Sequence, residues 1–424
     1  MMSPQRGCSV AIIGASLTGL SLALSLLQND LCSPEDMIIF DLRAPEVPDP
    51  ANASGVVLTP NGIAVLDSLG VLSQFRHLCW LSEYRTFKND RDETVRKTLI
   101  ANESLYGYKN HRVWRKTILE ALLAAVQERN VSIKWQARFE KVVRESDEGV
   151  SFIVNGVEET ADMLFGADGI HSTVRKYLDF EASPEYTGVT SVLSHIRRDE
   201  VRWPYESYEK ACTIQGKPGA LIVMPEDPEG IVVMVGKQVK MEPKSRQEWE
   251  EYGTHKELLC QFYKEGYEEW GPTAKQIIDA VCRNPETLYM WPFMRMTKLK
   301  RWFSDQGKVI IMGDAAHALP PSSGQGVSQA LEDVDSLTKL LRSGKELTTA
   351  LEFWQEMRQQ RIDTIFDWAT NATNVQRLPQ ADRDQLVREG KAKDANATEN
   401  FDDMRWLYQP QVDQAIDAWL KISG

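Results

Sequence analysis

CSVAIIGASLTGLSLALSLL, residues 8–27, is the segment from which the architecture of this chain can be predicted. Its first six residues are mostly apolar and partly β-branched, which is typical of a short strand buried in a parallel sheet. A glycine turn follows from Gly14 to Gly19, and apolar residues then recur at helical spacing from Leu20 to Leu27. The order of strand, glycine turn and helix is typical of the first unit of a Rossmann-like α/β domain.

This turn has the features that a dinucleotide requires. We expect Gly14 to form the tight exit from the strand and Gly19 to let the helix pack closely on the sheet. The backbone of Ser16, Leu17 and Thr18 would then face a pyrophosphate at the positive end of the helix. Ser16 occupies the middle position, where the G-x-G-x-x-G fingerprint has glycine, so the motif is weak when it is taken alone.

A second apolar run supports the same interpretation. Met37–Phe40 is predicted to be another buried strand, and it ends at Asp41, 22 residues after Gly19. An acidic side chain at this position would accept hydrogen bonds from the ribose hydroxyls of an adenosine. The alternative is that Asp41 only begins the loop that follows.

Two later segments also combine an apolar strand with a turn and a helix. DMLFGADGIHSTVR, residues 162–175, contains a Gly-Asp-Gly turn and a helix start for which Ser172 is a suitable N-cap. KVIIMGDAAHALPPSSGQGV, residues 308–327, brings Asp314 to the C-terminal end of a buried strand, where α/β sheets bind their ligands. We expect a long helix to follow, from about Val327 to Leu341.

These motifs resemble those of a known family. The segment at 166–175 resembles the DG motif of flavoprotein aromatic hydroxylases, and the segment at 313–326 resembles their GD motif. The chain is similar to the p-hydroxybenzoate and salicylate hydroxylases, with its motifs in the family's order from residue 8 to about 335. The resemblance implies a mixed α/β and α+β fold. Its parts are a Rossmann-like FAD-binding domain of glutathione-reductase type, an inserted β-sheet substrate domain and a C-terminal helical segment.

The resemblance also implies how the chain is divided. The FAD-binding domain is expected at 1–80, 105–182 and 291–342, the substrate domain at 81–104 and 183–290, and the C-terminal helices at 343–424. Within the substrate domain, hydrophobic patterning predicts strands at 187–196, 219–224 and 230–235, with further strands in 82–99. It predicts helices at 246–265, 273–283 and, after the last motif, 347–368.

Individual residues can be matched to the family's FAD contacts. Asp314 matches the aspartate near the ribityl and pyrophosphate groups, and Pro321 matches the proline on the oxygen-reaction side of the flavin. Arg115 matches an FAD-contacting arginine, with Arg112 as a competing choice in a shifted register. The complete expected FAD-binding set is Gly14, Ser16, Leu17, Thr18, Gly19, Asp41, Arg43, Gly55, Arg115, Asp168, Gly313, Asp314, Pro321, Gly324, Gly326 and Val327.

The resemblance weakens in the substrate domain. A gapless match places Leu193 where some relatives have a catalytic arginine, and Met224 where many have a tyrosine. Both departures remove groups that would hold a phenolate, so the pocket either suits a more apolar substrate or follows a different register. No catalytic base is evident, and the pocket candidates are His195, Arg197, Met224 and Pro321. For Arg197, a solvent-facing charge at a strand end is an equal alternative, and His317 is predicted to be structural.

Composition narrows the class of partner. The chain has 424 residues and a net charge of −12, which disfavours nucleic acid and anionic membranes. The six cysteines form no metal-ligand pattern and are expected to be mostly buried thiols. We therefore expect no metal, no membrane span and a cytoplasmic protein, either a monomer or a homodimer.

The predicted function follows from the resemblance. It implies that NAD(P)H reduces FAD, that O2 forms a flavin C4a-hydroperoxide, and that one oxygen atom is transferred to an aromatic or heteroaromatic small molecule. The context would be secondary metabolism or aromatic catabolism. No second dinucleotide motif follows the first, so NAD(P)H should bind only transiently. Two alternatives remain, a flavin-dependent dehydrogenase or oxidase on the same fold and a non-catalytic flavoprotein redox sensor.

Overall fold

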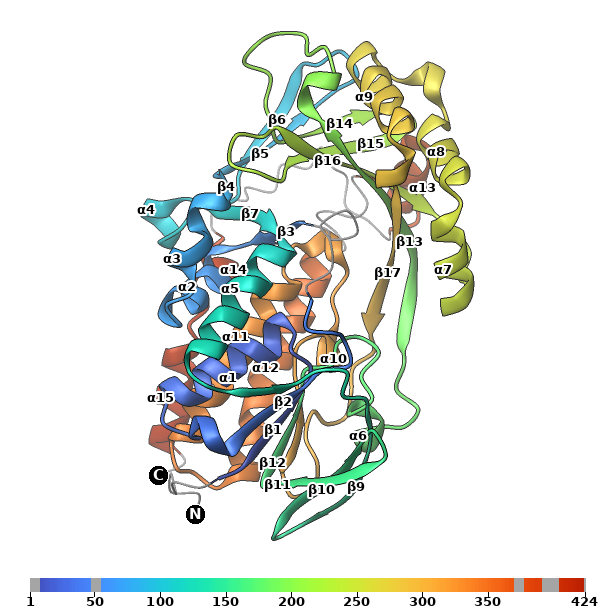
Figure 1. The fold of residues 1–424 in the computed structure, drawn as a ribbon. Coiled ribbons are helices and arrows are strands. Elements are labelled where there is room, and N and C mark those ends of the chain that lie inside the picture. Colours follow the sequence, from blue (N-terminus) through green and yellow to red (C-terminus); the bar gives the residue numbers. More distant parts are fainter. Residues whose placement is uncertain (1–7, 47–54, 370–376, 391–403, 423–424) are drawn as a thin grey trace.

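The computed structural model describes residues 8–46, 55–369, 377–390 and 404–422. Its two largest sheets lie towards opposite ends of an elongated molecule (Figure 1). The five-stranded sheet is parallel throughout, with the predicted first strand at its centre. Its order is β18 (Val309–Ile311), β12 (Met163–Gly166), β1 (Val10–Ile13), β2 (Met37–Phe40) and β8 (Ser132–Lys134). The strand, glycine turn and helix predicted from residues 8–27 are therefore confirmed as part of a parallel α/β sheet domain.

Helices and a small sheet enclose this parallel sheet. The predicted first helix is α1 (Leu17–Gln28), which packs against α5 (Arg115–Glu128) and α11 (Gly326–Arg342). A small antiparallel sheet also packs against the parallel sheet. Its strands are β9 (Phe139–Ser146), β10 (Gly149–Val154) and β11 (Val157–Ala161). Phe152 of β10 meets Phe40 of β2 edge to face, with ring centroids 5.8 Å apart, so this small sheet shares the same apolar core.

The seven-stranded sheet is built from two separate parts of the chain. Its order is β17 (Tyr289–Met296), β13 (Pro184–Arg197), β16 (Val232–Lys240), β15 (Gly219–Pro225), β14 (Cys212–Gly216), β5 (Tyr84–Lys88) and β6 (Thr94–Leu99). One face carries a separate apolar core with α8 (Lys256–Lys264) and α9 (Pro272–Arg283). The helix predicted at 246–265 is interrupted at His255, so that α7 (Arg246–Thr254) precedes α8.

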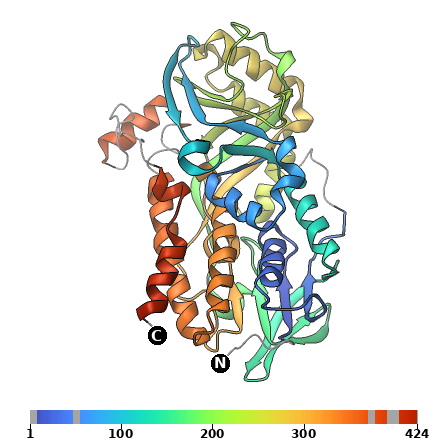
Figure 2. The ribbon, with the colours of Figure 1, turned by 90° about the vertical axis from the view of Figure 1, so that its left-hand side faces the viewer.

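The remaining elements join these two parts. β3 (Gly55–Leu58), β7 (Asn110–Trp114) and β4 (Trp80–Ser82) form a small sheet between them. Figure 2 shows α12 (Leu347–Ala369) and α15 (Val412–Ile422) side by side, where Phe353 stacks on Trp419 with a centroid distance of 4.8 Å. The shorter helices are α2 (Pro60–Ser68), α3 (Leu72–Phe75), α4 (Glu103–Tyr106), α6 (Arg175–Leu178), α10 (Asp314–His317), α13 (Gln380–Arg388) and α14 (Arg405–Tyr408).

The cysteines depart from expectation at one pair. Cys260 of α8 and Cys282 of α9 form a disulfide, because the packing of these two helices brings their Cα atoms to 5.5 Å. The other four cysteines are thiols, two buried and two partly buried. Within the described ranges, no helix is both long enough and apolar enough to cross a bilayer. The same residues contain no group of three or more His, Cys, Asp or Glu side chains that could hold a metal ion.

Candidate active site

The glycine turn after β1 is shaped by close backbone contacts. Gly14 has φ +106°, and a side chain there would also overlap the carbonyl oxygen of Ala167. A Cβ atom at Gly19 would collide with the carbonyl oxygen of Gly14, so the predicted close approach of α1 to the turn is present. Ser16 caps α1 by accepting a hydrogen bond from the Gly19 N–H at 3.2 Å, and it donates to the Ala167 carbonyl oxygen at 2.9 Å.

Asp41 is held directly beside this turn. Its carboxylate accepts hydrogen bonds from the Ala15 N–H at 2.7 Å and from the Arg43 guanidinium at 2.9 Å. Arg43 also donates to the Ala15 carbonyl oxygen at 2.8 Å. Neither side chain is a simple loop charge, because the pair ties the end of β2 to the turn after β1.

The two later turns are fixed to each other. The Asp168 carboxylate accepts hydrogen bonds from the Thr173 and Val174 N–H groups at 2.6 and 3.2 Å, and burial raises the pKa of this carboxyl. Ser172 accepts from the Arg175 N–H at 2.9 Å, as expected for a cap. The Arg175 guanidinium then donates to the Ala315 carbonyl oxygen at 2.9 Å. The segment at 166–175 therefore positions the segment that begins at Gly313.

One cavity of about 910 Å³ connects the parallel sheet to the seven-stranded sheet. It begins beside Leu17 and Thr18 at the start of α1, and passes Arg115 and Asp314. It continues along the segment 321–327, which precedes and begins α11. Since Gln325 gives no side-chain cap to α11, the first backbone N–H groups of that helix are available to a ligand.

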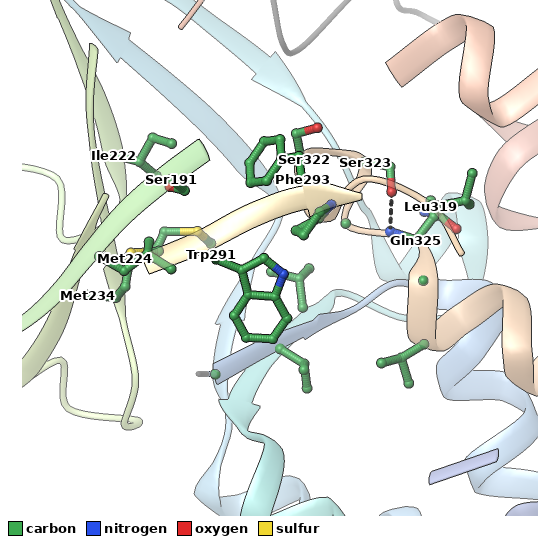
Figure 3. Close-up of a pocket in the computed structure, with 18 of the residues that line it drawn as sticks. Ser191, Ile222, Met224, Met234, Trp291, Phe293, Leu319, Ser322, Ser323 and Gln325 are labelled. Carbon is green, nitrogen blue, oxygen red and sulfur yellow. Dashed lines mark hydrogen bonds between the residues drawn. The ribbon is translucent and has the colours of Figure 1, made fainter. Parts of the chain in front are cut away.

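The far part of the cavity carries many apolar and aromatic side chains. Figure 3 shows Met224 and Met234 on the side of the seven-stranded sheet, and Leu319 and Gln325 on the side of α11. Trp291, on strand β17, lies between them. A cavity of this size, lined by many aromatic and apolar side chains together with polar and charged groups, has the character of a small-molecule site.

Comparison with known proteins identifies the cofactor of this chain. The family model described as FAD binding domain matches residues 7–369. The chain belongs to the FAD-dependent aromatic hydroxylase family. FAD is therefore its cofactor, and the chain is an FAD-dependent monooxygenase, as the motifs predicted.

Similar proteins match over most of their length. The FAD-dependent monooxygenase OpS4 of Beauveria bassiana (strain ARSEF 2860) is 24% identical over 379 residues, covering 86% of this chain and 84% of the relative. The salicylate hydroxylase of Pseudomonas putida is 24% identical, covering 97% and 95%. The structure of Klebsiella pneumoniae HpxO complexed with FAD and uric acid superposes with a TM-score of 0.75 at 19% identity, covering 100% of this chain and 99% of the other.

The residues around the first part of the cavity fit FAD. Gly324 and Gly326 face open space where a Cβ atom would meet no neighbour, so a planar ring can approach this backbone closely. Unpaired N–H groups at the start of α11 suit the electron-rich pyrimidine edge of a flavin. Val327 and Pro321 line the same wall as predicted, whereas Gly313 lies behind it and packs against Thr18.

The two arginines considered for FAD differ in their partners. Arg112 is buried and bound to Glu226, with its Nη2 2.5 Å and its Nε 3.0 Å from the carboxylate oxygens. Arg115 lines the cavity, where burial lowers its pKa and Asp314 raises it. Because the guanidinium of Arg112 is already paired, the geometry favours Arg115 as the FAD contact.

The pocket candidates fall into two groups. Met224 and Pro321 line the cavity. His195 lies behind the wall, where its Nε2 is 3.2 Å from Glu226 and its ring packs on Trp114 with centroids 4.9 Å apart. Arg197 is exposed at the end of β13 and pairs with Asp199 at 2.9 Å, which agrees with the solvent-facing alternative.

A buried network around Glu226 also packs against the start of β3. Burial alone would raise the pKa of Glu226, but Arg112 and His195 hold it below its ordinary value. A side chain at Gly55 would collide with the Glu226 carboxylate. Gly55 lines the cavity, and its close packing against this carboxylate leaves no room for a side chain.

A second buried network supports the GD turn and was not predicted. Asp333 of α11 accepts hydrogen bonds from the Gly313 N–H at 2.9 Å and from Arg358 at 2.8 Å, and lies 2.5 Å from His317 Nε2. His317 is buried in these contacts, so the structural role predicted for it is confirmed. Arg358 also contacts Glu332 at 2.5 Å, which links the turn to α12.

The chain beyond α11 completes the cavity. Trp368, Arg377, Met404 and Tyr408 all line it. Arg361 of α12 secures the tail by donating to the backbone carbonyl oxygen of Leu407 at 2.6 Å. The described part of the C-terminal segment therefore contributes to the cavity wall.

Proposed function

We propose that this enzyme uses NAD(P)H and O2 to insert one oxygen atom into an aromatic or heteroaromatic small molecule. In the balanced reaction, substrate, O2, NAD(P)H and a proton give oxygenated substrate, water and NAD(P)+. Bound FAD supplies the electron transfer and the oxygen activation. The observation that carries this proposal is the single cavity that joins the start of α1 to the apolar wall of the seven-stranded sheet.

Each wall of the cavity has a separate task in this proposal. Leu17, Thr18, Arg115 and Asp314 line the cavity, and with Asp41 and Arg43 beside the turn at 14–19 they would hold the adenosine and diphosphate portion of FAD. The segment 321–327 would contact the flavin ring, where the first N–H groups of α11 would stabilise negative charge. The domain division expected from the sequence belongs to the same proposal, with substrate bound between the two domains.

The substrate wall determines which molecules enter. Trp291 and Phe293 offer aromatic faces, and Met224 and Met234 offer adaptable apolar surface. Leu193 also lines the cavity, so the position of the expected arginine carries no charge. We propose that these side chains orient an aromatic ring over the flavin and keep water from the reacting atoms.

Names of similar proteins agree with this class. They include a 6-methylsalicylate 1-monooxygenase of Aspergillus terreus (strain NIH 2624 / FGSC A1156) and a 3-hydroxybenzoate 6-hydroxylase of Klebsiella oxytoca. We propose a role in secondary metabolism or aromatic catabolism for the present enzyme. A cytoplasmic location, transient binding of NAD(P)H and a monomeric or homodimeric state belong to the same proposal.

Isotope labelling tests the proposed reaction. The FAD-loaded enzyme is incubated with NAD(P)H, 18O2 and a panel of aromatic and indolic compounds, and the products are analysed by mass spectrometry. One 18O atom in a product that requires both enzyme and NAD(P)H supports the proposal. Oxygen consumed only to hydrogen peroxide, with desaturated or unchanged organic compounds, assigns the chain to the oxidase and dehydrogenase alternative. No NAD(P)H oxidation with any compound would favour the redox-sensor alternative.

A further inference from the structure

The cavity is strongly cationic, although the chain carries a net charge of −12. The described residues that line it include seven arginine and lysine side chains but only two carboxylates. The cationic residues are Arg85, Arg96, Arg112, Arg115, Lys244, Arg246 and Arg377, and the acidic residues are Glu250 and Asp314. Such a concentration of one charge in an acidic protein indicates a ligand of opposite charge.

Most of these cations already have a counterpart. Arg112 is bound to Glu226, and Arg246 to Glu250 at 2.9 Å. The guanidinium of Arg96 lies over the Phe87 ring at 4.0 Å, and the ammonium of Lys244 over the Tyr252 ring at 4.5 Å. Arg115 lies near Asp314 in the part of the cavity that FAD occupies in our proposal.

Arg85 and Arg377 differ from the others. In the part of the chain that the structure describes, neither guanidinium has a hydrogen bond, an ion pair or an aromatic face as a partner. Both side chains line the cavity and are partly buried by protein. A partly buried charge without a counterion is costly, and proteins retain such groups mainly where a ligand neutralises them.

Two different walls bring these arginines together. Arg85 is on β5 opposite Thr98 of β6, on the strand face that also carries Phe87 and Arg96. Arg377 follows α12, and its carbonyl group lies against Gly219 of β15. Burial lowers the pKa of Arg377 to about 9, with repulsion from Arg85 acting in the same direction. At neutral pH both groups remain cationic, so each makes the other more costly to bury.

We propose that Arg85 and Arg377 form a subsite for an anionic group of the substrate, and that the substrate is an aromatic carboxylate. This inference rests on the proposed function, because it places the ligand in the same cavity as FAD. A planar carboxylate accepts parallel hydrogen bonds from a guanidinium, so two arginines can fix its position and orientation. The diphosphate of FAD is expected at the start of α1, on the opposite sheet, which leaves this pair for a different anion.

The other source of such an anion is the 2′-phosphate of NADPH, and the test separates the two. Binding of 1-naphthoate and of its neutral analogue 1-naphthamide is titrated through the absorbance of bound FAD. The variants are Arg85→Met, Arg377→Met and the charge-retaining Arg85→Lys. Arg91→Met is the control, because Arg91 belongs to the same hairpin but is exposed and pairs with Glu93. Rates of FAD reduction by NADPH and by NADH are measured for each variant.

Charge-assisted hydrogen bonds are worth roughly tenfold or more in affinity. The proposal therefore predicts that the wild-type enzyme and Arg91→Met bind the acid at least about tenfold more tightly than the amide. Arg85→Met and Arg377→Met should lose this preference, while Arg85→Lys keeps most of it. Equal binding of acid and amide by the wild type would overturn the proposal.

A different result identifies the other anion. If Arg85→Met slows reduction by NADPH but not by NADH, and the preference for the acid persists, the pair binds the dinucleotide phosphate and the proposal is wrong. Failure of the proposed oxygenation is recognised separately, since it would appear as absence of 18O incorporation while the acid preference is intact. Retention of FAD and of the melting temperature by each variant shows that the fold is preserved.

Discussion

Replacement of Arg358 by Met should destabilise the GD turn far more than loss of a surface ion pair. Arg358 is fully buried and contacts Asp333 at 2.8 Å, Glu332 at 2.5 Å and the Gln329 side chain at 2.7 Å. Removing one partner of a buried ion pair costs about 3–5 kcal/mol, because the carboxylates stay buried without their cation. For a chain of this length, that corresponds to a fall in Tm of roughly 3–6 °C.

The measurement is a thermal melt followed by the release of FAD fluorescence, with FAD content determined after purification. The matched control is Lys298→Met, which breaks the exposed pair that Lys298 makes with Asp363 of the same helix, α12. An exposed pair is worth about 0–1 kcal/mol, so the control should change Tm by about 1 °C or less. Equal melting temperatures for the two variants would show that the buried ion pairs of Arg358 contribute no more to stability than an exposed pair.

Other substitutions and conditions test separate parts of the site. Asp314→Ala should release FAD and leave a folded protein with unchanged far-UV circular dichroism; full FAD occupancy would remove this residue from the site. Arg115→Ala should raise the Kd for FAD by about tenfold or more, and unchanged retention would assign the contact to Arg112. Gly19→Ala should lower Tm, because its methyl group would collide with the carbonyl oxygen of Gly14. Such overpacking costs about 1–3 kcal/mol and exceeds the helix-propensity gain of about 1 kcal/mol. An unchanged or raised Tm would show that the backbone of the turn can move to accept the methyl group. Acid should also lower Tm. Burial alone would raise the pKa of Glu332 on α11, but two arginines hold this pKa below its ordinary value. The ionised carboxylate therefore contributes fully to stability above the ordinary pKa, and this contribution is lost as the pH falls through the lowered pKa. A flat Tm profile from about pH 7 to about pH 3 would contradict this.

Elements whose signals are local can be predicted from the sequence. The first strand, its glycine turn and the first helix follow from residues 8–27, and Met37–Phe40 matches β2 at both ends. The long helix predicted from about Val327 to Leu341 extends from Gly326 to Arg342. These segments combine regular hydrophobic spacing with glycine at positions that the backbone requires, so little depends on distant residues.

Strands with weaker patterns escape prediction. β17 contains Pro292, which argues against a strand, but β17 is at the edge of its sheet, where proline is tolerated. β14 is short and lies between the predicted strands at 187–196 and 219–224, where the pattern indicates none. The interruption between α7 and α8 at His255 follows Gly253 and Thr254, two residues that weaken a helix.

The polar networks of the site depend on long-range contacts that no local pattern encodes. Arg112 and Glu226 are 114 positions apart, and Asn61 meets Glu332 across 271 positions. The sequence indicates Arg112 and His195 as candidate ligand contacts, but not as partners of one buried carboxylate. It does not single out Arg377 either, since the importance of this residue depends on where the tail docks.

Oxygen transfer in this cavity is tested most directly by anaerobic reduction of the FAD-loaded enzyme with NAD(P)H, followed by rapid mixing with O2 and observation of the flavin absorbance. We expect a transient absorbing species that precedes the return of oxidised FAD and whose decay rate depends on a bound aromatic ligand. Return of oxidised FAD in one phase, unaffected by any ligand, would contradict assignment of the cavity to oxygen transfer.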